Sequence, residues 1–261
     1  MVVTIDSSSN AKIKHICKIA SSSKYRKESS EFFLEGLRLC CDACKSFVEA
    51  ESVFFTEKAD EKNSSHIEEM ISVCKNAYKI SESVCDKIAQ TENSQGVFCI
   101  CKMPESDGKQ KIDTTKKYIA LDNVQNPDNL GAISRTAEAL GISGLIVSGG
   151  CDIYNPKAQR AAMGSLLRLP VFKTDDLVSY LRKLQKSAMK IYATTPDASS
   201  LKITEADFSS GTICVIGNEA NGVSSNVFDV CEKITIPMLG RAESLNAAMA
   251  AAVTMWEMMR S

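Results

Sequence analysis

The sequence lacks a membrane-spanning segment, and it lacks the excess of positive charge that would attract polyanions in general. No charged segment followed by an apolar core opens the chain, and Glu257 interrupts the Ala/Met-rich run near its end, so no stretch is long enough to span a bilayer. The 31 Lys and Arg residues nearly balance the 32 Asp and Glu residues, which leaves a net charge of −1. Contact with nucleic acid therefore requires a local basic patch. We expect a globular, cytoplasmic protein without membrane contact.

Two common cofactor fingerprints are missing, and histidine is scarce. Neither GxGxxG nor GxxxxGK[ST] occurs at a predicted strand-to-helix turn, which argues against the usual dinucleotide fold and against an NTPase. The two histidines, His15 and His66, both lie in the first 100 residues. The remainder of the chain therefore offers no histidine for proton transfer.

Cysteine, in contrast, is abundant. The 11 cysteines are odd in number and no secretion signal places them in an oxidising compartment, so we interpret them as reduced thiols. Cys41 and Cys44 have CxxC spacing, but no second pair lies nearby to complete a tetrahedral metal site. Buried structural thiols are favoured over metal or redox roles, and we predict no bound metal.

The composition predicts two domains. Pro, Gly, Ser and charged residues accumulate over 102–117, which indicates a linker between a small α/β domain at 1–101 and a larger domain at 118–261. In the larger domain, strands alternate with helices, which predicts a parallel sheet covered on both faces. Ligands of such sheets bind at the carboxyl ends of the strands.

A basic segment stands out in the first domain. Six Lys or Arg residues and no acid occur from Ala11 to Lys27. The pattern is typical of a solvated helix face, and it is also what a contact to an RNA phosphate backbone requires. The candidates for RNA contact here are Lys12, Lys14, Lys24 and Arg26.

Three predicted strands of the larger domain run directly into polar clusters. Asn129 can cap the helix that follows the first strand, and Ser244 can cap the last helix. Arg135 lies in an otherwise small and apolar helical stretch, where a cation is costly unless it is paired or binds an anion. Glu219 follows another strand, in a loop where Gly217 permits close backbone approach. Each cluster alone could be an ordinary turn or cap.

Taken together, the clusters carry a resemblance. The stretches "NPDNLGAISRTAEALG", "VIGNEANGVS" and "IPMLGRAESLNAAMA", in this order, resemble the three sequence motifs of the SpoU (TrmH) family of RNA ribose 2′-O-methyltransferases, within the SPOUT superfamily. The resemblance covers residues 118–261. The preceding part resembles the substrate-binding domain that often precedes this methylase domain, although Ala11 stands where relatives commonly have Pro.

The resemblance implies a fold, a cofactor and a partner. The parallel sheet would end in a trefoil knot, and S-adenosylmethionine would bind in that knot. Two subunits would complete the RNA site, so a homodimer is expected, with the Ala-rich last helix in its contact. The residues that the resemblance assigns to the cofactor are Thr194, Gly217, Ile236, Met238 and Leu245.

The resemblance also implies a reaction, in which a methyl group moves from S-adenosylmethionine to a ribose 2′-hydroxyl of rRNA or tRNA. It gives Arg135 the central role, also toward RNA, with support from Asn129, Glu219, Ser244 and Asn246. A guanidinium, with a pKa above about 12, is a poor base, so gripping a phosphate and orienting the ribose is an equally good account. One alternative is a non-catalytic RNA-binding or ribosome-associated factor that retains the fold. Another is a small-molecule methyltransferase or nucleotide-binding enzyme, which the missing fingerprints disfavour.

Overall fold

The computed structural model describes residues 2–104 and 111–260, and the chain packs as two units. The first unit consists of Met1–Ser106 and Asp152–Arg168, and the second of Asp107–Cys151 and Leu169–Ser261. Nothing in the sequence indicated that the segment from Asp152 to Arg168 packs with the first unit. Of the predicted linker at 102–117, residues 105–110 lie outside the described residues.

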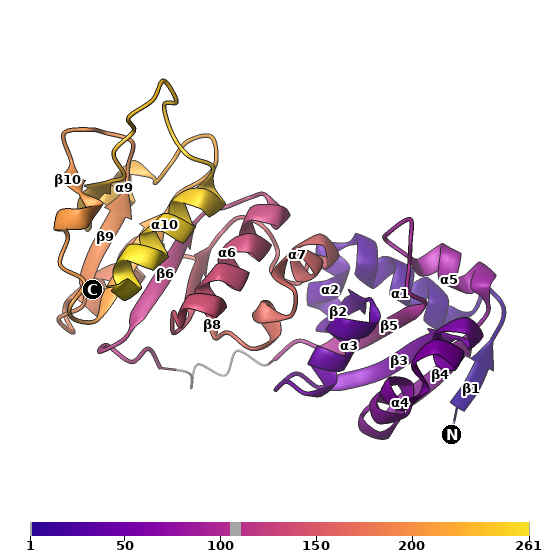
Figure 1. The fold of residues 1–261 in the computed structure, drawn as a ribbon. Helices are drawn as coiled ribbons and strands as arrows, with labels where there is room; N and C mark the ends of the chain where they lie inside the picture. Colours follow the sequence, from indigo (N-terminus) through magenta and orange to yellow (C-terminus); the bar gives the residue numbers. More distant parts are fainter. Residues whose placement is uncertain (1, 105–110, 261) are drawn as a thin grey trace. The chain divides into compact units, whose positions relative to one another are not determined.

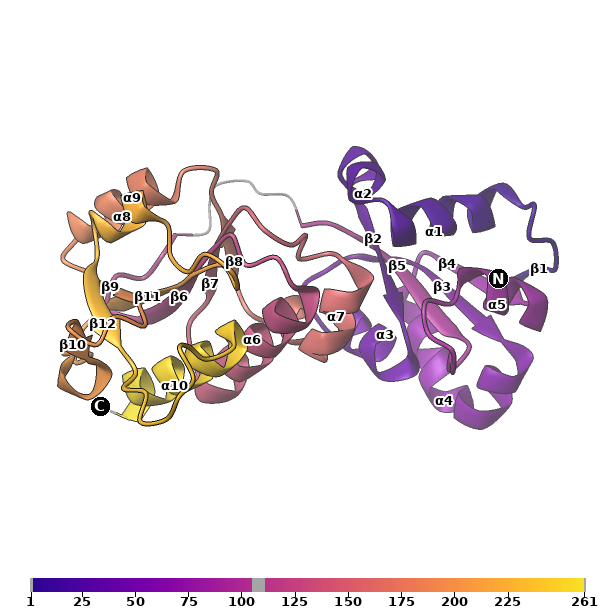
Figure 2. The same cartoon turned by 90° about the horizontal axis from the view of Figure 1, so that it is seen from above.

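The first unit contains a mixed five-stranded sheet in the order β1-β4-β3-β5-β2, in which β1, β4 and β3 are parallel and β5 is antiparallel to β3 and β2. Figures 1 and 2 show this sheet between helices. Its elements are β1 (Val2–Ile5), α1 (Ala11–Ser21), α2 (Ser23–Ser29), β2 (Glu31–Glu35), α3 (Leu37–Cys44), β3 (Ala50–Thr56), α4 (Glu57–Val73), β4 (Asn76–Ile80), α5 (Glu82–Ile88) and β5 (Val97–Lys102), with α7 (Pro156–Ala162) and the 3₁₀ turn η1 (Ser165–Leu167) from the later segment.

Both faces of this sheet are buried because its strands are apolar on both sides. Alternate side chains of a strand point to opposite faces, so Phe33 packs in the cluster with α1 and α5, while Phe32 packs in the cluster with α3 and α4. Figure 2 shows α1 on one side of the sheet and α4 on the other. Leu167, from the later segment, is part of the second cluster.

The second unit contains a seven-stranded sheet in the order β10-β12-β9-β11-β6-β7-β8, with every neighbouring pair parallel. This confirms the predicted α/β class with a parallel sheet. Its elements are β6 (Lys117–Asp122), α6 (Pro127–Leu140), β7 (Leu145–Ser148), β8 (Val171–Lys173), α8 (Leu177–Gln185), β9 (Lys190–Thr194), β10 (Leu201–Lys202), η2 (Ile203–Glu205), β11 (Thr212–Ile216), α9 (Ser225–Phe228), β12 (Glu232–Thr235) and α10 (Ala247–Arg260).

Helices cover the two faces of the second sheet in pairs. Helix α8 and helix α9 pack on one face, through Leu181 and Val227 against residues such as Ala120 and Val215. Helices α6 and α10 lie side by side on the other face (Figures 1 and 2). Within the described residues, no helix combines the length and the apolar character that crossing a membrane requires.

Two predicted helix caps are wrong, and both errors concern the site. Helix α6 begins at Pro127, and Asn126 caps it by accepting a hydrogen bond from the N–H of Asp128 at 2.8 Å. Asn129 therefore lies inside the first turn. At α10, Asn246 accepts a hydrogen bond from the N–H of Ala248 at 2.9 Å, so Asn246 caps this helix in place of Ser244.

The buried side of α10 provides a test of the packing on α6 and the sheet. Met255 is fully buried, whereas Met259, on the same helix, is 38% exposed. Met255→Ala should lower the free energy of unfolding by about 2–5 kcal/mol, because it leaves a cavity. Met259→Ala, the matched control, should lower it by less than about 1 kcal/mol. Urea unfolding measures both, and equal losses would contradict this placement of α10.

Candidate active site

The loops after β6 and β11, which are neighbouring parallel strands, are tied together at the carboxyl edge of the sheet. Asn218 donates its side-chain N–H to the carbonyl of Asn123 at 2.9 Å. Ser224 donates both its N–H and its hydroxyl to Asp122 Oδ2, at 2.8 and 2.7 Å. The end of β6 and the second motif therefore form one hydrogen-bonded edge.

The loop after β11 is tight, and its glycines are required by geometry. Asn218 and Gly222 exchange two backbone hydrogen bonds of 3.0 and 2.9 Å, and Gly222 has a φ of 68°. A Cβ atom at Gly217 would lie 2.1 Å from the backbone of Gly222 and Val223, so no larger residue fits there without movement. This turn presents Glu219 toward the start of α6.

Glu219 accepts hydrogen bonds from three groups around the start of α6. One carboxylate oxygen accepts from the N–H of Asn126 and from the side chain of Asn129, both at 2.9 Å. The other oxygen accepts from the N–H of Gln125 at 3.1 Å. A carboxylate at a helix N-terminus is also favoured by the helix dipole.

The third motif joins this network through Asn246. Its side-chain N–H donates to Oδ1 of Asn129 at 3.1 Å, and Asn129 is buried. One side chain from each of the three motifs, Asn129, Glu219 and Asn246, therefore meets in one hydrogen-bonded group. The sequence predicted these three residues for the site, and the structure brings them together.

The hydrogen bonds set the charge of Glu219. Burial raises the pKa of this carboxyl, but the bonds from Asn129, Asn126 and Gln125 outweigh burial and lower the pKa below its ordinary value. Glu219 is therefore ionised at neutral pH, and it only accepts hydrogen bonds from its neighbours.

Arg135 and Ser244, the other two predicted catalytic residues, lie outside this network. The expectation that Arg135 sits in apolar surroundings is wrong, since α6 buries Ile133 and Ser134 and turns Arg135 to solvent. Among the described residues, Arg135 makes no hydrogen bond or ion pair. An exposed guanidinium without an internal partner is available to an anion. Ser244 is exposed in the loop before α10.

The residues predicted to hold the cofactor lie at or just beyond the carboxyl ends of β9, β11 and β12. Thr194 ends β9 and donates its hydroxyl to the carbonyl of Val215 at 3.1 Å, while Gly217 follows β11. Ile236 and Met238 follow β12, and Leu245 stands next to Asn246. This placement fits a ligand of the sheet edge.

The loop between β12 and α10 also exposes two aliphatic side chains. Leu239 is fully exposed and Leu245 is 39% exposed, although β12 ends in the buried residues Ile234 and Thr235. Exposed apolar side chains at the edge of a sheet fit an organic ligand. Leu239 was not among the residues predicted for the site.

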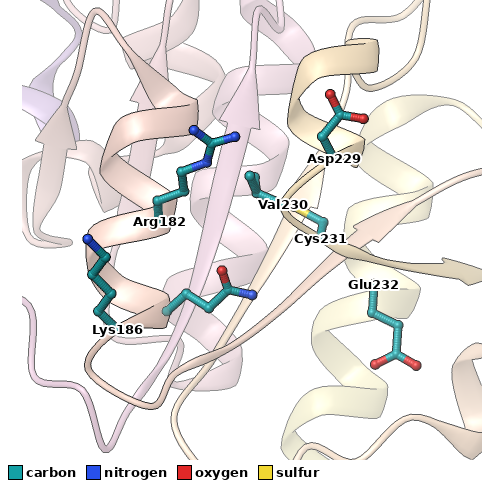
Figure 3. A pocket seen from close by; sticks show the side chains of 7 residues that line it. Arg182, Lys186, Asp229, Val230, Cys231 and Glu232 are labelled. Carbon is teal, nitrogen blue, oxygen red and sulfur yellow. The ribbon is translucent and has the colours of Figure 1, made fainter.

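A cavity of about 660 Å³ lies elsewhere in the second unit (Figure 3). It is located at the amino end of β12 and contains none of the predicted site residues. Cations and anions both line it, so it favours no single ligand charge. Its lining residues are Arg182, Gln185, Lys186, Asp229, Val230, Cys231 and Glu232.

In the first unit, three of the four residues predicted to contact RNA are exposed. Lys12 and Lys14 lie on α1 and Lys24 on α2. The prediction for Arg26 does not fit the structure, since this side chain is only 3% exposed and pairs with Asp152 at 2.8 Å. The described residues contain no group of three or more His, Cys, Asp or Glu side chains that could hold a metal ion.

Comparison with known proteins identifies the two parts of the chain. The SpoU rRNA Methylase family matches residues 116–256, and the MRM3-like substrate binding domain matches residues 10–99. The 23S rRNA (guanosine(2553)-2′-O)-methyltransferase RlmP of Bacillus subtilis (strain 168) is 30% identical over 97% of this chain and 98% of its own length.

Two further proteins extend the comparison. The crystal structure of an AdoMet-bound rRNA methyltransferase from Sinorhizobium meliloti has a TM-score of 0.88 and 28% identity, and the match covers 99% of this chain and 98% of that chain. The 23S rRNA (uridine(2479)-2′-O)-methyltransferase of Streptomyces viridochromogenes is 33% identical over 63% of this chain and 60% of its own length.

The fold, the three-motif network and these matches define an enzyme class, that of S-adenosylmethionine-dependent RNA ribose 2′-O-methyltransferases. Within that class, the chain belongs to the SpoU rRNA Methylase family.

The lowered pKa of Glu219 predicts a pH dependence. A carboxyl whose pKa is lower in the folded state contributes stability above its unfolded pKa of about 4.3, and this contribution is lost as the pH falls through the folded pKa. The difference in unfolding free energy between wild type and Glu219→Gln should therefore be constant above about pH 5.5 and shrink below about pH 4.3.

Chemical denaturation at a series of pH values measures this difference. Glu205→Gln, at an exposed carboxylate in η2 outside the network, is the matched control and should leave the profile nearly unchanged. A Glu219→Gln difference that stays constant down to pH 3 would contradict the assigned hydrogen bonds.

Proposed function

We propose that this enzyme methylates a ribose 2′-hydroxyl of 23S rRNA. The observation that carries the assignment is the group of Asn129, Glu219 and Asn246, which joins all three motifs beside an exposed Arg135. The named relatives support the substrate, since both act on 23S rRNA. The domain match over residues 10–99 supports a macromolecular substrate over a small molecule.

In this proposal the hydrogen-bonded network positions α6, and Arg135 on that helix binds the RNA. When bound, S-adenosylmethionine would supply a methyl group on a cationic sulfur, and the C–S bond would break as the bond to the ribose 2′-oxygen forms, leaving S-adenosylhomocysteine. Asn129, held by Glu219 and Asn246, fixes the first turn of α6, and α6 carries Arg135. The guanidinium grips a phosphate and orients the ribose, and a phosphate oxygen or water accepts the hydroxyl proton. Alignment of this kind lowers a barrier by up to about 7–11 kcal/mol.

The cofactor would lie at the carboxyl edge of β9, β11 and β12, against Thr194, Gly217, Ile236, Met238 and Leu245. Ser244, from the same loop, would close over it. We further propose that the segment from β12 to α10 threads through the preceding chain as a trefoil knot. This proposal rests on the family resemblance of the three motifs, and the bond from Asn246 to Asn129 is consistent with it because the last segment returns to the first motif.

The RNA surface would include the first unit. Lys12, Lys14 and Lys24 are exposed on α1 and α2, and such cations provide sequence-independent phosphate contacts. We propose a cytoplasmic location, because the relatives named above are 23S rRNA methyltransferases of bacteria.

A homodimer would complete the site. On α10, Met249, Val253 and Trp256 are 55%, 41% and 60% exposed, and their spacing places them on one side of the helix. A row of exposed apolar residues on one helix is typical of a protein contact. A second copy of the chain, packed through this face, would bury it.

Methyl transfer tests the central proposal. Arg135→Ala should lower the transfer of labelled methyl from S-adenosylmethionine to unmodified 23S rRNA by about 100-fold, since one aligned cationic donor is lost. Cofactor binding, measured by calorimetry, should be unchanged. Arg182→Ala, at an exposed Arg on α8, is the matched control and should retain full activity.

The chemical form of the labelled product and the RNA species that carries the label distinguish the alternative functions. Label in an alkali-resistant dinucleotide establishes ribose methylation, and label in tRNA only would overturn the 23S rRNA assignment. Full activity of Arg135→Ala would refute its role. Absence of both methyl transfer and cofactor binding would favour a non-catalytic RNA-binding factor.

Sedimentation tests the dimer. The double change Met249→Glu and Trp256→Glu should convert the dimer to a monomer, because it places two like charges on each side of the contact. Lys183→Glu, at an exposed position of α8, should leave the dimer intact. A wild-type chain that is monomeric at micromolar concentration would contradict this arrangement.

A further inference from the structure

Arg26, which the sequence suggested for RNA contact, is instead the buried centre of a polar cluster in the first unit. Its Nη1 donates to the carbonyls of Ile19 and Ala20, at 2.7 and 3.3 Å, in the last turn of α1. Its Nε and Nη2 lie 2.9 and 2.8 Å from Asp152 Oδ2. Arg26 therefore joins α1, α2 and Asp152.

Asp152 is held from several sides. Besides Arg26, Ser23 on α2 donates its hydroxyl to Oδ2 at 3.0 Å. The N–H of Tyr154 donates to Oδ1 at 3.0 Å, and the N–H of Asn155 donates to the Asp152 carbonyl at 2.9 Å. Because a buried Arg needs a fixed partner, the position of Asp152 depends on the position of α1 and α2.

One residue earlier, the chain packs against the loop that follows β6. The N–H of Cys151 donates to the carbonyl of Val124 at 2.8 Å. A Cβ atom at Gly150, which has a φ of 74°, would lie 2.2 Å from that same carbonyl oxygen, so the two backbones are in direct contact. Gly149 also has a positive φ, of 63°. This approach leaves the loop little freedom to shift.

The loop held in this way leads directly to the catalytic group. Val124 precedes Gln125 and Asn126, whose N–H groups bind Glu219 at 3.1 and 2.9 Å. Glu219 binds Asn129. A continuous series of hydrogen bonds and two peptide bonds, Cys151–Asp152 and Val124–Gln125, thus connects Arg26 to Glu219.

The same segment has two other ion pairs, which serve for comparison. Arg160 lies 3.5 Å from Glu35, and Arg168 lies 3.1 Å from Asp42. These pairs hold residues further along the segment, away from the Cys151–Asp152 peptide bond. They fix the segment in the first unit but are not directly connected to the loop 123–126.

We propose that Arg26 and Asp152 are positioning residues for methyl transfer. Through the short connection Gly149–Cys151, they restrain the loop 123–126 and hence Glu219. The kinetic test of this inference rests on the proposed RNA methylation. The structural test, by hydrogen exchange, does not.

Hydrogen exchange provides the structural readout. Asp152→Asn should raise amide exchange at Gln125 and Asn126 about 10-fold, while the amides of β6 stay protected. Asp42→Asn, the matched control, removes the ion pair at the other end of the segment and should leave exchange at Gln125 and Asn126 unchanged. Because this measurement needs no RNA, it tests the connection even if the proposed substrate is wrong.

Kinetics provide the functional readout. Asp152→Asn should lower kcat about 10-fold and leave KM for RNA and the cofactor affinity within about 2-fold, whereas Asp42→Asn should have wild-type values. Arg26→Gln should show the same loss, and the double variant no more than either alone, because both residues act through one connection. Ser23→Ala, a milder change, should give a smaller loss in the same parameter and covers the case in which Asp152→Asn does not fold.

The outcomes separate a positioning role from a purely structural one. A lower melting temperature with wild-type kcat and exchange would overturn the proposal, and so would a raised KM with unchanged kcat. Additive losses in the double variant would show two independent effects and would also overturn it. If the wild-type chain shows no methyl transfer, only the proposed function is refuted. Hydrogen exchange at Gln125 and Asn126 then decides whether this inference holds.

Discussion

The site depends on one carboxylate. Glu219 accepts hydrogen bonds from two backbone N–H groups and one side-chain amide at the start of α6, and it stays ionised because those bonds outweigh the effect of burial. Asn129 uses its N–H for Glu219 and its oxygen for Asn246, so its two functional groups join the second and third motifs. Removal of the carboxylate would leave three donors without their acceptor.

The all-parallel sheet determines where the hydrogen-bonded group around Glu219 can form. Because β12, β9, β11 and β6 are neighbours and run in one direction, the loops that follow them emerge at one edge. The hydrogen-bonded group of Asn129, Glu219 and Asn246 shares that edge with the proposed cofactor residues. The cavity of Figure 3 lies at the amino end of β12, is lined by side chains of both charges and contains none of the residues proposed for the site.

The sequence predicted the sheet and its polar edge better than the local roles of single residues. Strands followed by polar loops predicted the sheet and its active edge, since hydrophobic alternation is a local signal. The roles of Asn129 and Asn246 could not be read in the same way, because Asn126 and Ser244 offer equally good capping chemistry one turn or less away. Arg135 and Arg26 were misjudged in opposite directions: neighbouring apolar residues suggested burial for Arg135, and neighbouring lysines suggested exposure for Arg26. The partner of Arg26, Asp152, is distant in sequence, and no local pattern indicates such a pairing.

The segment Asp152–Arg168 packs in a unit whose sheet is complete by residue 102, and this order matters while the chain is being made. When β5 leaves the ribosome, Arg26, Glu35 and Asp42 have not yet received the partners that this later segment provides. At roughly 5–20 residues per second, those partners follow after several seconds. The N-terminal unit therefore reaches its final state only after part of the domain that follows has been made.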